Sequence, residues 1–238
     1  NQPGEAKFFS EKDIDLALKK FILTFWNSFI FFKTYRSKKS VKHRVSNKIL
    51  DRWVISRLNE LIEEVTQKLD KYDVTAAARA IESFIINDLS LWYIRRSRKR
   101  FEEAEGALSF VLQTLANLTA PFIPFLSEYI YQCLKRNFKQ SVHLEDWPKV
   151  NKKLIDRKLE EKMARVRELV TSVLAERAKA GIKVRQPLNK LQITNYKLQK
   201  EKELLELIKD EVNIKKITFG KPLKLDTKIT PALKEEGI

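Results

Sequence analysis

The recurrence of apolar residues at helical spacing constrains this fold more than any other feature of the sequence. Ser10, followed three residues later by Asp13, is typical of a helix start. An apolar stripe follows at Ile14, Leu18, Phe21, Phe25, Phe29 and Phe32. Similar spacing predicts amphipathic helices over about residues 10–32, 47–69, 73–92, 103–118 and 124–134. Helices of this kind, joined by short connections, predict a helical bundle.

The pattern changes after the last of these helices. Residues 141–148 (SVHLEDWP) show no helical spacing, and they predict a domain boundary. A long helix, charged on most faces, is expected over about residues 151–180, and Gly181 suits the residue that ends it.

The last 50 residues have the pattern of a small α/β unit. Alternating segments at 190–194 and 214–219 predict strands, with a helix at 198–211 between them and a short strand within 221–229. The expected fold class is therefore mainly α. Its expected parts are a bundle at 1–148, a long helix and connector at 149–187, and an α/β unit at 188–238.

The chain is strongly basic. Its 47 Lys and Arg residues against 31 Asp and Glu give a formal net charge of +16. A surface of this sign gains free energy when it displaces the counterions condensed on a polyanion. Nucleic acid or an anionic membrane surface is therefore the expected class of partner.

Basic residues gather in three runs, which provide the candidate RNA contacts. The densest run has five cations within residues 95–100, directly after an apolar segment that can anchor it in a core. The alternative interpretation is a solvated helix end whose cations complement the helix dipole and pair with nearby glutamates. The candidates are Arg36, Lys38, Lys39, Lys42 and Arg44; Trp92, Tyr93, Arg95, Arg96, Arg98, Lys99 and Arg100; and Lys183 and Arg185.

Helical geometry divides the densest run into two faces. Arg95 and Arg98 lie three residues apart and share one face, whereas Arg96 and Arg100 lie four apart and share another. We therefore expect one pair to contact RNA and the other pair to be spared.

Several kinds of chemistry find no candidate residues. The five glycines are isolated, so no Gly-rich phosphate loop can be built, and the two histidines have no triad context. No Cys/His cluster has zinc spacing, and the lone Cys133 suits a reducing cytoplasm. The apolar run 21–32 is too short to span a bilayer. We therefore expect no catalytic residue, no metal site and no membrane partner.

The same residues resemble a known family. Residues 51–59 (DRWVISRLN) resemble the opening of the anticodon-binding bundle of class I aminoacyl-tRNA synthetases. Residues 87–101 (NDLSLWYIRRSRKRF) are similar to the form of that bundle in the isoleucyl-tRNA synthetases. Further matches to the isoleucyl pattern are 118–128 (LTAPFIPFLSE), 141–148, 176–188 (ERAKAGIKVRQPL) and 225–231 (LDTKITP). The resemblance covers nearly the whole chain in the same order.

The resemblance implies the C-terminal, tRNA-binding region of an enzyme that joins isoleucine to its tRNA with ATP and Mg²⁺. The HIGH and KMSKS signatures of the catalytic domain are not in this chain, and neither is the editing domain. The chain alone is therefore expected to be inactive and to hold no cofactor. Its expected partners are the isoleucine tRNA and the catalytic and editing domains of the same polypeptide.

Two alternatives stay open at this level. One is an RNA-binding helical module of another class I synthetase or of a tRNA-modifying protein. The other is a non-enzymatic protein-interaction or membrane-surface domain that uses the basic, amphipathic first helix.

Overall fold

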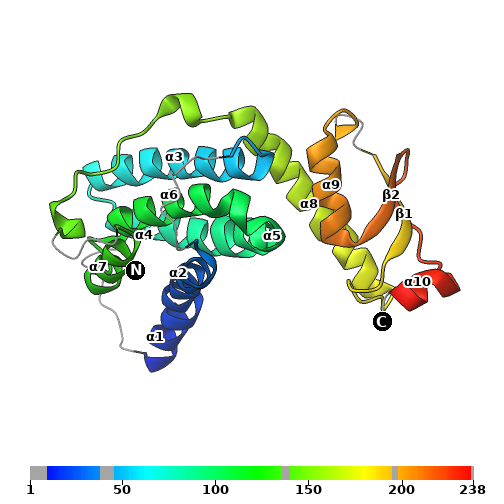
Figure 1. Ribbon diagram of the computed structural model, residues 1–238, viewed down its shortest axis with the longest axis horizontal. Coiled ribbons are helices and arrows are strands. Elements are labelled where there is room, and N and C mark those ends of the chain that lie inside the picture. Colours follow the sequence, from blue (N-terminus) through cyan, green and yellow to red (C-terminus); the bar gives the residue numbers. More distant parts are fainter. Residues whose placement is uncertain (1–9, 38–45, 136–139, 195–197, 237–238) are drawn as a thin grey trace. The chain divides into compact units, whose positions relative to one another are not determined.

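The computed structural model describes residues 10–37, 46–135, 140–194 and 198–236 (Figure 1). The chain divides into two units, one ending at Asp156 and the other beginning at Arg157. The sequence placed boundaries after residues 148 and 187 instead. The difference arises because the segment before Arg157 is hydrogen-bonded to a helix of the first unit, whereas the long helix after it packs within the second.

The first unit is the expected helical bundle. Ser10 Oγ accepts a hydrogen bond from the N–H of Asp13, and Asp73 Oδ1 accepts one from the N–H of Ala76, so the two predicted helix starts are confirmed. The helical elements are α1 (Glu11–Ala17), η1 (Leu18–Ile22), α2 (Leu23–Tyr35), α3 (Ile49–Asp70), α4 (Val74–Ser83), η2 (Phe84–Ile94), α5 (Arg95–Ser97), η3 (Arg98–Arg100), α6 (Phe101–Thr119) and α7 (Pro124–Lys135).

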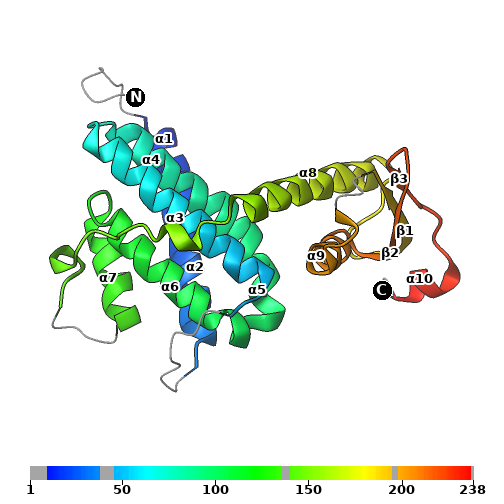
Figure 2. The same ribbon diagram turned by 90° about the horizontal axis from the view of Figure 1, so that it is seen from above.

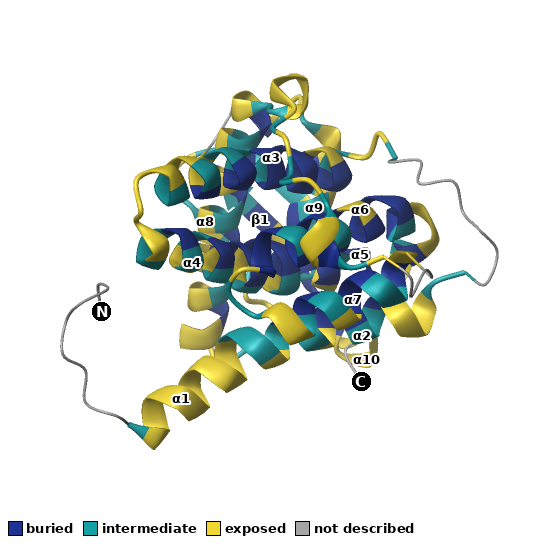
Figure 3. Ribbon diagram, turned by 90° about the vertical axis from the view of Figure 1, so that its left-hand side faces the viewer, coloured by how far each residue is buried: buried dark blue, intermediate teal, exposed yellow. Residues whose placement is uncertain are grey.

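Helix α3 provides the centre of this core, with α4 and α6 beside it (Figure 2). Trp53, Val54, Leu58 and Val65 are almost completely buried on it, as its apolar spacing predicts. Helix α1, in contrast, contains no buried residue (Figure 3). No helix among the described residues is both long and apolar enough to cross a membrane.

The segment after α7, residues 141–156, runs back along α3 (Figure 1). We call it the return segment, and it contains the short turns η4 (Val142–Leu144) and η5 (Lys152–Leu154). The indole N–H of Trp147 donates to the Thr66 hydroxyl at 2.8 Å, and the N–H of Asn151 donates to Asn59 Oδ1 at 2.9 Å. These bonds satisfy polar groups that no regular helix or strand would pair.

The end of the return segment is fixed by two further contacts, both made by Asp156. The N–H of Asp156 donates to the Ser56 hydroxyl at 2.7 Å, and its carboxylate forms an ion pair with Arg52 at 2.9 Å. The acceptors on α3 recur on one side of the helix, at Ser56, Asn59 and Thr66. The predicted domain boundary at 141–148 is thus an ordered part of the first unit.

The start of the return segment is held by Glu128 of α7. Its carboxylate accepts hydrogen bonds from the N–H of Val142 at 2.8 Å and the Ser141 hydroxyl at 3.0 Å. Burial alone would raise the pKa of Glu128, but these bonds, with one from Gln132, outweigh burial and lower the pKa from its ordinary value.

The second unit combines a helix pair with a three-stranded sheet. The strand order is β2-β1-β3, with β1 and β2 parallel and β3 antiparallel to β1. The long helix α8 and the helix α9 pack together, and α9 also packs on β2. Its elements are α8 (Arg157–Lys179), β1 (Leu188–Ile193), α9 (Lys202–Val212), β2 (Ile214–Phe219), β3 (Lys224–Leu225) and α10 (Pro231–Glu236). The predicted fold class, mainly α with a small α/β unit, is confirmed.

The lowered pKa of Glu128 makes the stability of the first unit depend on pH. The ionised carboxylate stabilises the fold above about pH 5, and this contribution is lost as the pH falls through the folded-state pKa. We expect Glu128→Gln to be less stable than the wild type at pH 7 and to approach it in acid. Urea unfolding between about pH 3 and pH 7 measures the difference.

The matched control is Glu64→Gln, which changes an exposed glutamate on α3. It should show a much smaller difference from the wild type at every pH. A stability loss in Glu128→Gln that stays constant across the pH range would contradict the anchoring role of the carboxylate.

Candidate nucleic-acid interface

The densest basic run lies where the helical winding changes. Residues Phe84–Ile94 form π-helical turns, Arg95–Ser97 form a single α turn, and Arg98–Arg100 form a 3₁₀ turn before α6 begins. Because each kind of turn rotates successive side chains by a different angle, neighbouring cations point in different directions. The run consequently divides into cations that contact the protein and cations that are exposed.

Arg100 points into the protein and forms an ion pair with Asp51. Its guanidinium donates to both carboxylate oxygens, at 2.6 and 3.0 Å, and the Tyr93 hydroxyl donates to the same carboxylate at 2.7 Å. The Asp51 side chain is 0% exposed and that of Arg100 is 20% exposed. The bidentate geometry is the strongest form of this interaction.

The pKa values of Tyr93 and Arg100 reflect the charge of Asp51. Burial and the adjacent carboxylate raise the pKa of Tyr93 well above its ordinary value, so its hydroxyl stays a donor. Burial would lower the pKa of Arg100, but its hydrogen bonds and charge attraction to Asp51 raise it. Tyr93 and Arg100, two of the predicted RNA contacts, are thus bound to the buried Asp51 carboxylate.

Arg96 is also engaged by its neighbours. Its guanidinium carbon lies 3.1 Å from the centre of the Trp92 ring, and it donates to the carbonyl of Trp92 at 2.9 Å. Trp92 is 6% exposed and so offers no open face on which a base could stack. Trp92 therefore acts as the apolar anchor of the run, with Arg96 covering it.

The remaining cations of the run, Arg95, Arg98 and Lys99, are exposed. Arg98 lies 5.9 Å from the Phe31 ring of α2. Of the two pairs expected from helical spacing, the structure therefore leaves Arg95 and Arg98 accessible and binds Arg96 and Arg100 to the protein. A polyanion that approaches this end of the bundle meets these three exposed cations.

The first basic run is described only at its start. Arg36 caps helix α7 from outside, since its guanidinium donates to the carbonyl of Cys133 at 2.9 Å. The preceding Tyr35 packs against Phe31 and Phe101. The other predicted contacts of this run, Lys38, Lys39, Lys42 and Arg44, lie outside the described residues.

The third basic run lies on a loop that Arg177 holds from within. Arg177 is 1% exposed, and it donates to the carbonyls of Val212 at 3.1 Å and Lys183 at 2.7 Å, and to that of Gln186. Sequence analysis missed this residue. The signal was its position four residues after Val173, at the end of the apolar stripe of α8.

Asn213 fixes the same loop from a second side. It adopts a left-handed conformation, with φ of 49°, and its side-chain amide donates to the carbonyls of Val184 at 2.9 Å and Arg185 at 3.0 Å. Because the loop carbonyls turn inward, Lys183 and Arg185 are exposed. Both predicted contacts of the third run are therefore available to a ligand.

The described residues contain no group of three or more His, Cys, Asp or Glu side chains that could hold a metal ion. The surface that they do offer is cationic, in both units.

Comparison with known proteins identifies the family. The model of the family described as "Anticodon-binding domain of tRNA ligase" matches residues 51–193, and this chain therefore belongs to that family. The match begins at Asp51, the buried carboxylate, and ends at Ile193, the last residue of β1.

Curated relatives agree with this assignment. The isoleucine–tRNA ligase of Clostridium acetobutylicum is 38% identical over 233 residues, which cover 90% of this chain and 22% of the relative. That of Thermus thermophilus is 37% identical over 259 residues, or 99% of this chain and 25% of the relative. The chain thus spans about a quarter of the length of these relatives.

A solved structure also shows a partial likeness. It is the ternary complex of Agrobacterium radiobacter K84 agnB2 LeuRS-tRNA-LeuAMS, with a TM-score of 0.45 and 23% sequence identity. The aligned region covers 61% of this chain and 17% of that chain.

The two groups of cations should separate in a stability measurement. Arg100→Ala leaves the buried Asp51 carboxylate without its ionic partner, which should reduce the free energy of unfolding by about 3–5 kcal/mol. Arg95→Ala removes an exposed cation and should change it by no more than about 0.5 kcal/mol. Urea unfolding followed by tryptophan fluorescence measures both variants. Equal, small losses at the two positions would contradict the structural role of Arg100.

Proposed function

We propose that this chain is the tRNA-binding region of an isoleucine–tRNA ligase and that it orients tRNA for a catalytic domain elsewhere in the same polypeptide. The family match over residues 51–193 is the observation that carries the proposal. The names of the curated relatives support isoleucine as the amino acid. The positive charge of the chain supports RNA as the ligand.

Binding would combine two kinds of contact. Phosphates would be contacted by exposed cations, which would position the RNA. These cations are Arg95, Arg98 and Lys99 at the end of the bundle, and Lys183 and Arg185 on the loop held by Arg177. Anticodon bases, splayed out of their stack, would be recognised by stacking and hydrogen bonds. Because the loop backbone and the Asp51 network are already ordered, little conformational entropy would be lost on binding.

The rest of the reaction would belong to other parts of the enzyme. ATP and Mg²⁺ would bind to the catalytic domain, and an editing domain would be the other partner within the polypeptide. Aminoacylation supplies the ribosome, so we propose a cytoplasmic location, in agreement with the lone, half-buried Cys133.

A binding titration at several salt concentrations tests the proposal. We expect the chain to bind isoleucine tRNA with an affinity that falls steeply as salt rises, because binding releases counterions. Arg95→Ala and Arg98→Ala should each flatten the log–log salt slope by about one unit or less. Filter binding or fluorescence anisotropy gives both quantities.

The matched control is Arg79→Ala, which removes an exposed arginine of α4 that pairs with Glu82. It should leave the slope unchanged. Competition with non-cognate tRNA tests the isoleucine assignment. The absence of tRNA binding at low salt, or an affinity independent of salt, would refute the proposal.

A further inference from the structure

The open side of the sheet in the second unit places three lysines together. Side chains of a strand alternate between its two faces, so Lys190 and Gln192 of β1 share a face. The register of the strands sets Lys190 opposite Lys216 and Gln192 opposite Thr218, and Lys224 of β3 lies beside Gln192. We call this set, Lys190, Gln192, Lys216, Thr218 and Lys224, the lysine face.

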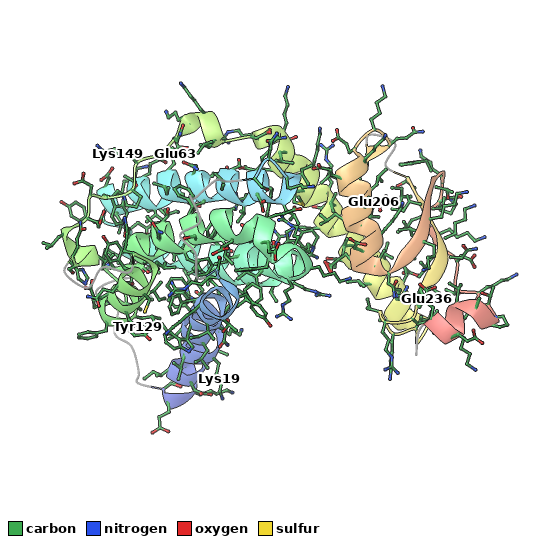
Figure 4. The ribbon with its side chains drawn as sticks, viewed as in Figure 1. Lys19, Glu63, Tyr129, Lys149, Glu206 and Glu236 are labelled. Carbon is green, nitrogen blue, oxygen red and sulfur yellow. The ribbon has the colours of Figure 1, made fainter. Side chains whose placement is uncertain are left out.

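The other face of the sheet is covered. Leu191 and Ile193, which alternate with the lysine face along β1, are 0% exposed, and α9 packs along this side of the sheet (Figure 1). On the side away from α9, side chains that end in nitrogen extend into solvent (Figure 4). On the same side of the sheet, the pair that precedes Lys190 and Lys216, Leu188 and Ile214, is buried.

The lysines of this face lack the ion pairs that other lysines of the unit make. Lys190, Lys216 and Lys224 form no ion pair with any residue that the structure describes. In the same unit, Lys209 pairs with Glu206 at 2.7 Å, and Lys215, adjacent to Lys216 on β2, pairs with Glu236 (Figure 4). The lysine face therefore carries three positive charges that no described acidic side chain neutralises through an ion pair.

A hollow at the edge of this face adds a further cation. Residues Lys190, Gln192 and 224–228 line it, and they include Lys228, which also makes no ion pair with a described residue. The one acid in the lining is Asp226, whose carboxylate accepts the N–H of Lys228 at 3.2 Å. Cations outnumber carboxylates around the hollow, which favours an anionic occupant.

The pairing of Lys190 with Lys216 has an energetic cost. Like charges directly opposite each other on adjacent strands destabilise a sheet, whereas opposite charges stabilise it. Strands lie about 4.8 Å apart, so both ammonium groups can reach one anion placed between them. A bound phosphate would turn this repulsion into two favourable contacts.

We propose that the lysine face binds the phosphate backbone of RNA, as a contact separate from Arg95 and Arg98. This inference rests on the proposed function, because the RNA is the same tRNA. The face is open along the strands, which suits an extended polyanion better than a single free phosphate. Gln192 donates to the carbonyl of Pro222 at 3.0 Å and Thr218 to that of Leu191 at 3.5 Å, so the lysines are the groups of this face that would contact the phosphates.

The test is tRNA binding by the full chain with Lys190 and Lys216 both changed to Gln. This variant should flatten the log–log salt slope by up to about two units and weaken binding at low salt at least about tenfold. The matched control, Lys209→Gln with Lys215→Gln, removes two lysines of the same unit that have acidic partners, and it should keep the wild-type slope. The midpoint temperature of thermal unfolding of the first variant at low salt should be no lower than that of the wild type, since the repulsion between Lys190 and Lys216 is removed.

The outcomes separate this inference from the proposed function. Wild-type chain that binds no tRNA would overturn both. Wild-type binding that depends on Arg95 and Arg98, with an unchanged slope in the Lys190/Lys216 variant, would overturn the inference alone. So would a variant that loses binding to polyglutamate while it keeps its tRNA affinity, because the face would then fit an acidic protein. Lys224→Gln supplies the same readout if the double variant does not fold.

Discussion

The buried carboxylate of Asp51 is the constraint on which the bundle depends. A charge without solvent must be paired, and Arg100 and the Tyr93 hydroxyl meet this need from the basic segment. A second ion pair has its charges exchanged between the two elements: Arg57 of α3 pairs with the buried carboxylate of Asp88 in η2, at 3.1 Å. These two ion pairs hold residues 88–100 against α3. The directions in which the other cations of the densest run point therefore follow from how this segment packs on α3.

The second unit uses the same device with backbone in place of a carboxylate. Arg177, buried at the end of α8, donates to carbonyls of the loop that precedes β1 and to that of Val212 in α9. Asn213 donates to the loop carbonyls of Val184 and Arg185. In both units, a buried polar side chain therefore positions a basic element whose other cations are exposed. The order is built into the fold before a ligand arrives.

The sequence was sufficient for the fold because apolar spacing and helix caps are local signals. It predicted the helices capped by Ser10 and Asp73, and also strands at 190–194 and 214–219, to within a few residues. The sequence did not predict which arginines pair with buried groups and which are exposed, because arginine occurs in both settings. The change from π to 3₁₀ winding decides which of Arg95 and Arg100 turns inward, and no periodicity reveals it. The return segment was likewise interpreted as a boundary because its partners lie about 90 residues away on α3.

Arginine reactivity measures the division of the basic run most directly. The chain is treated with an arginine-specific dicarbonyl reagent, with and without isoleucine tRNA, and modification at each arginine is quantified by mass spectrometry. We expect Arg95 and Arg98 to react in the free protein and to be protected by tRNA, while Arg100 and Arg177 react slowly in both states. Modification of Arg100 as fast as that of Arg95, or no protection of Arg95 and Arg98 by bound tRNA, would contradict the division.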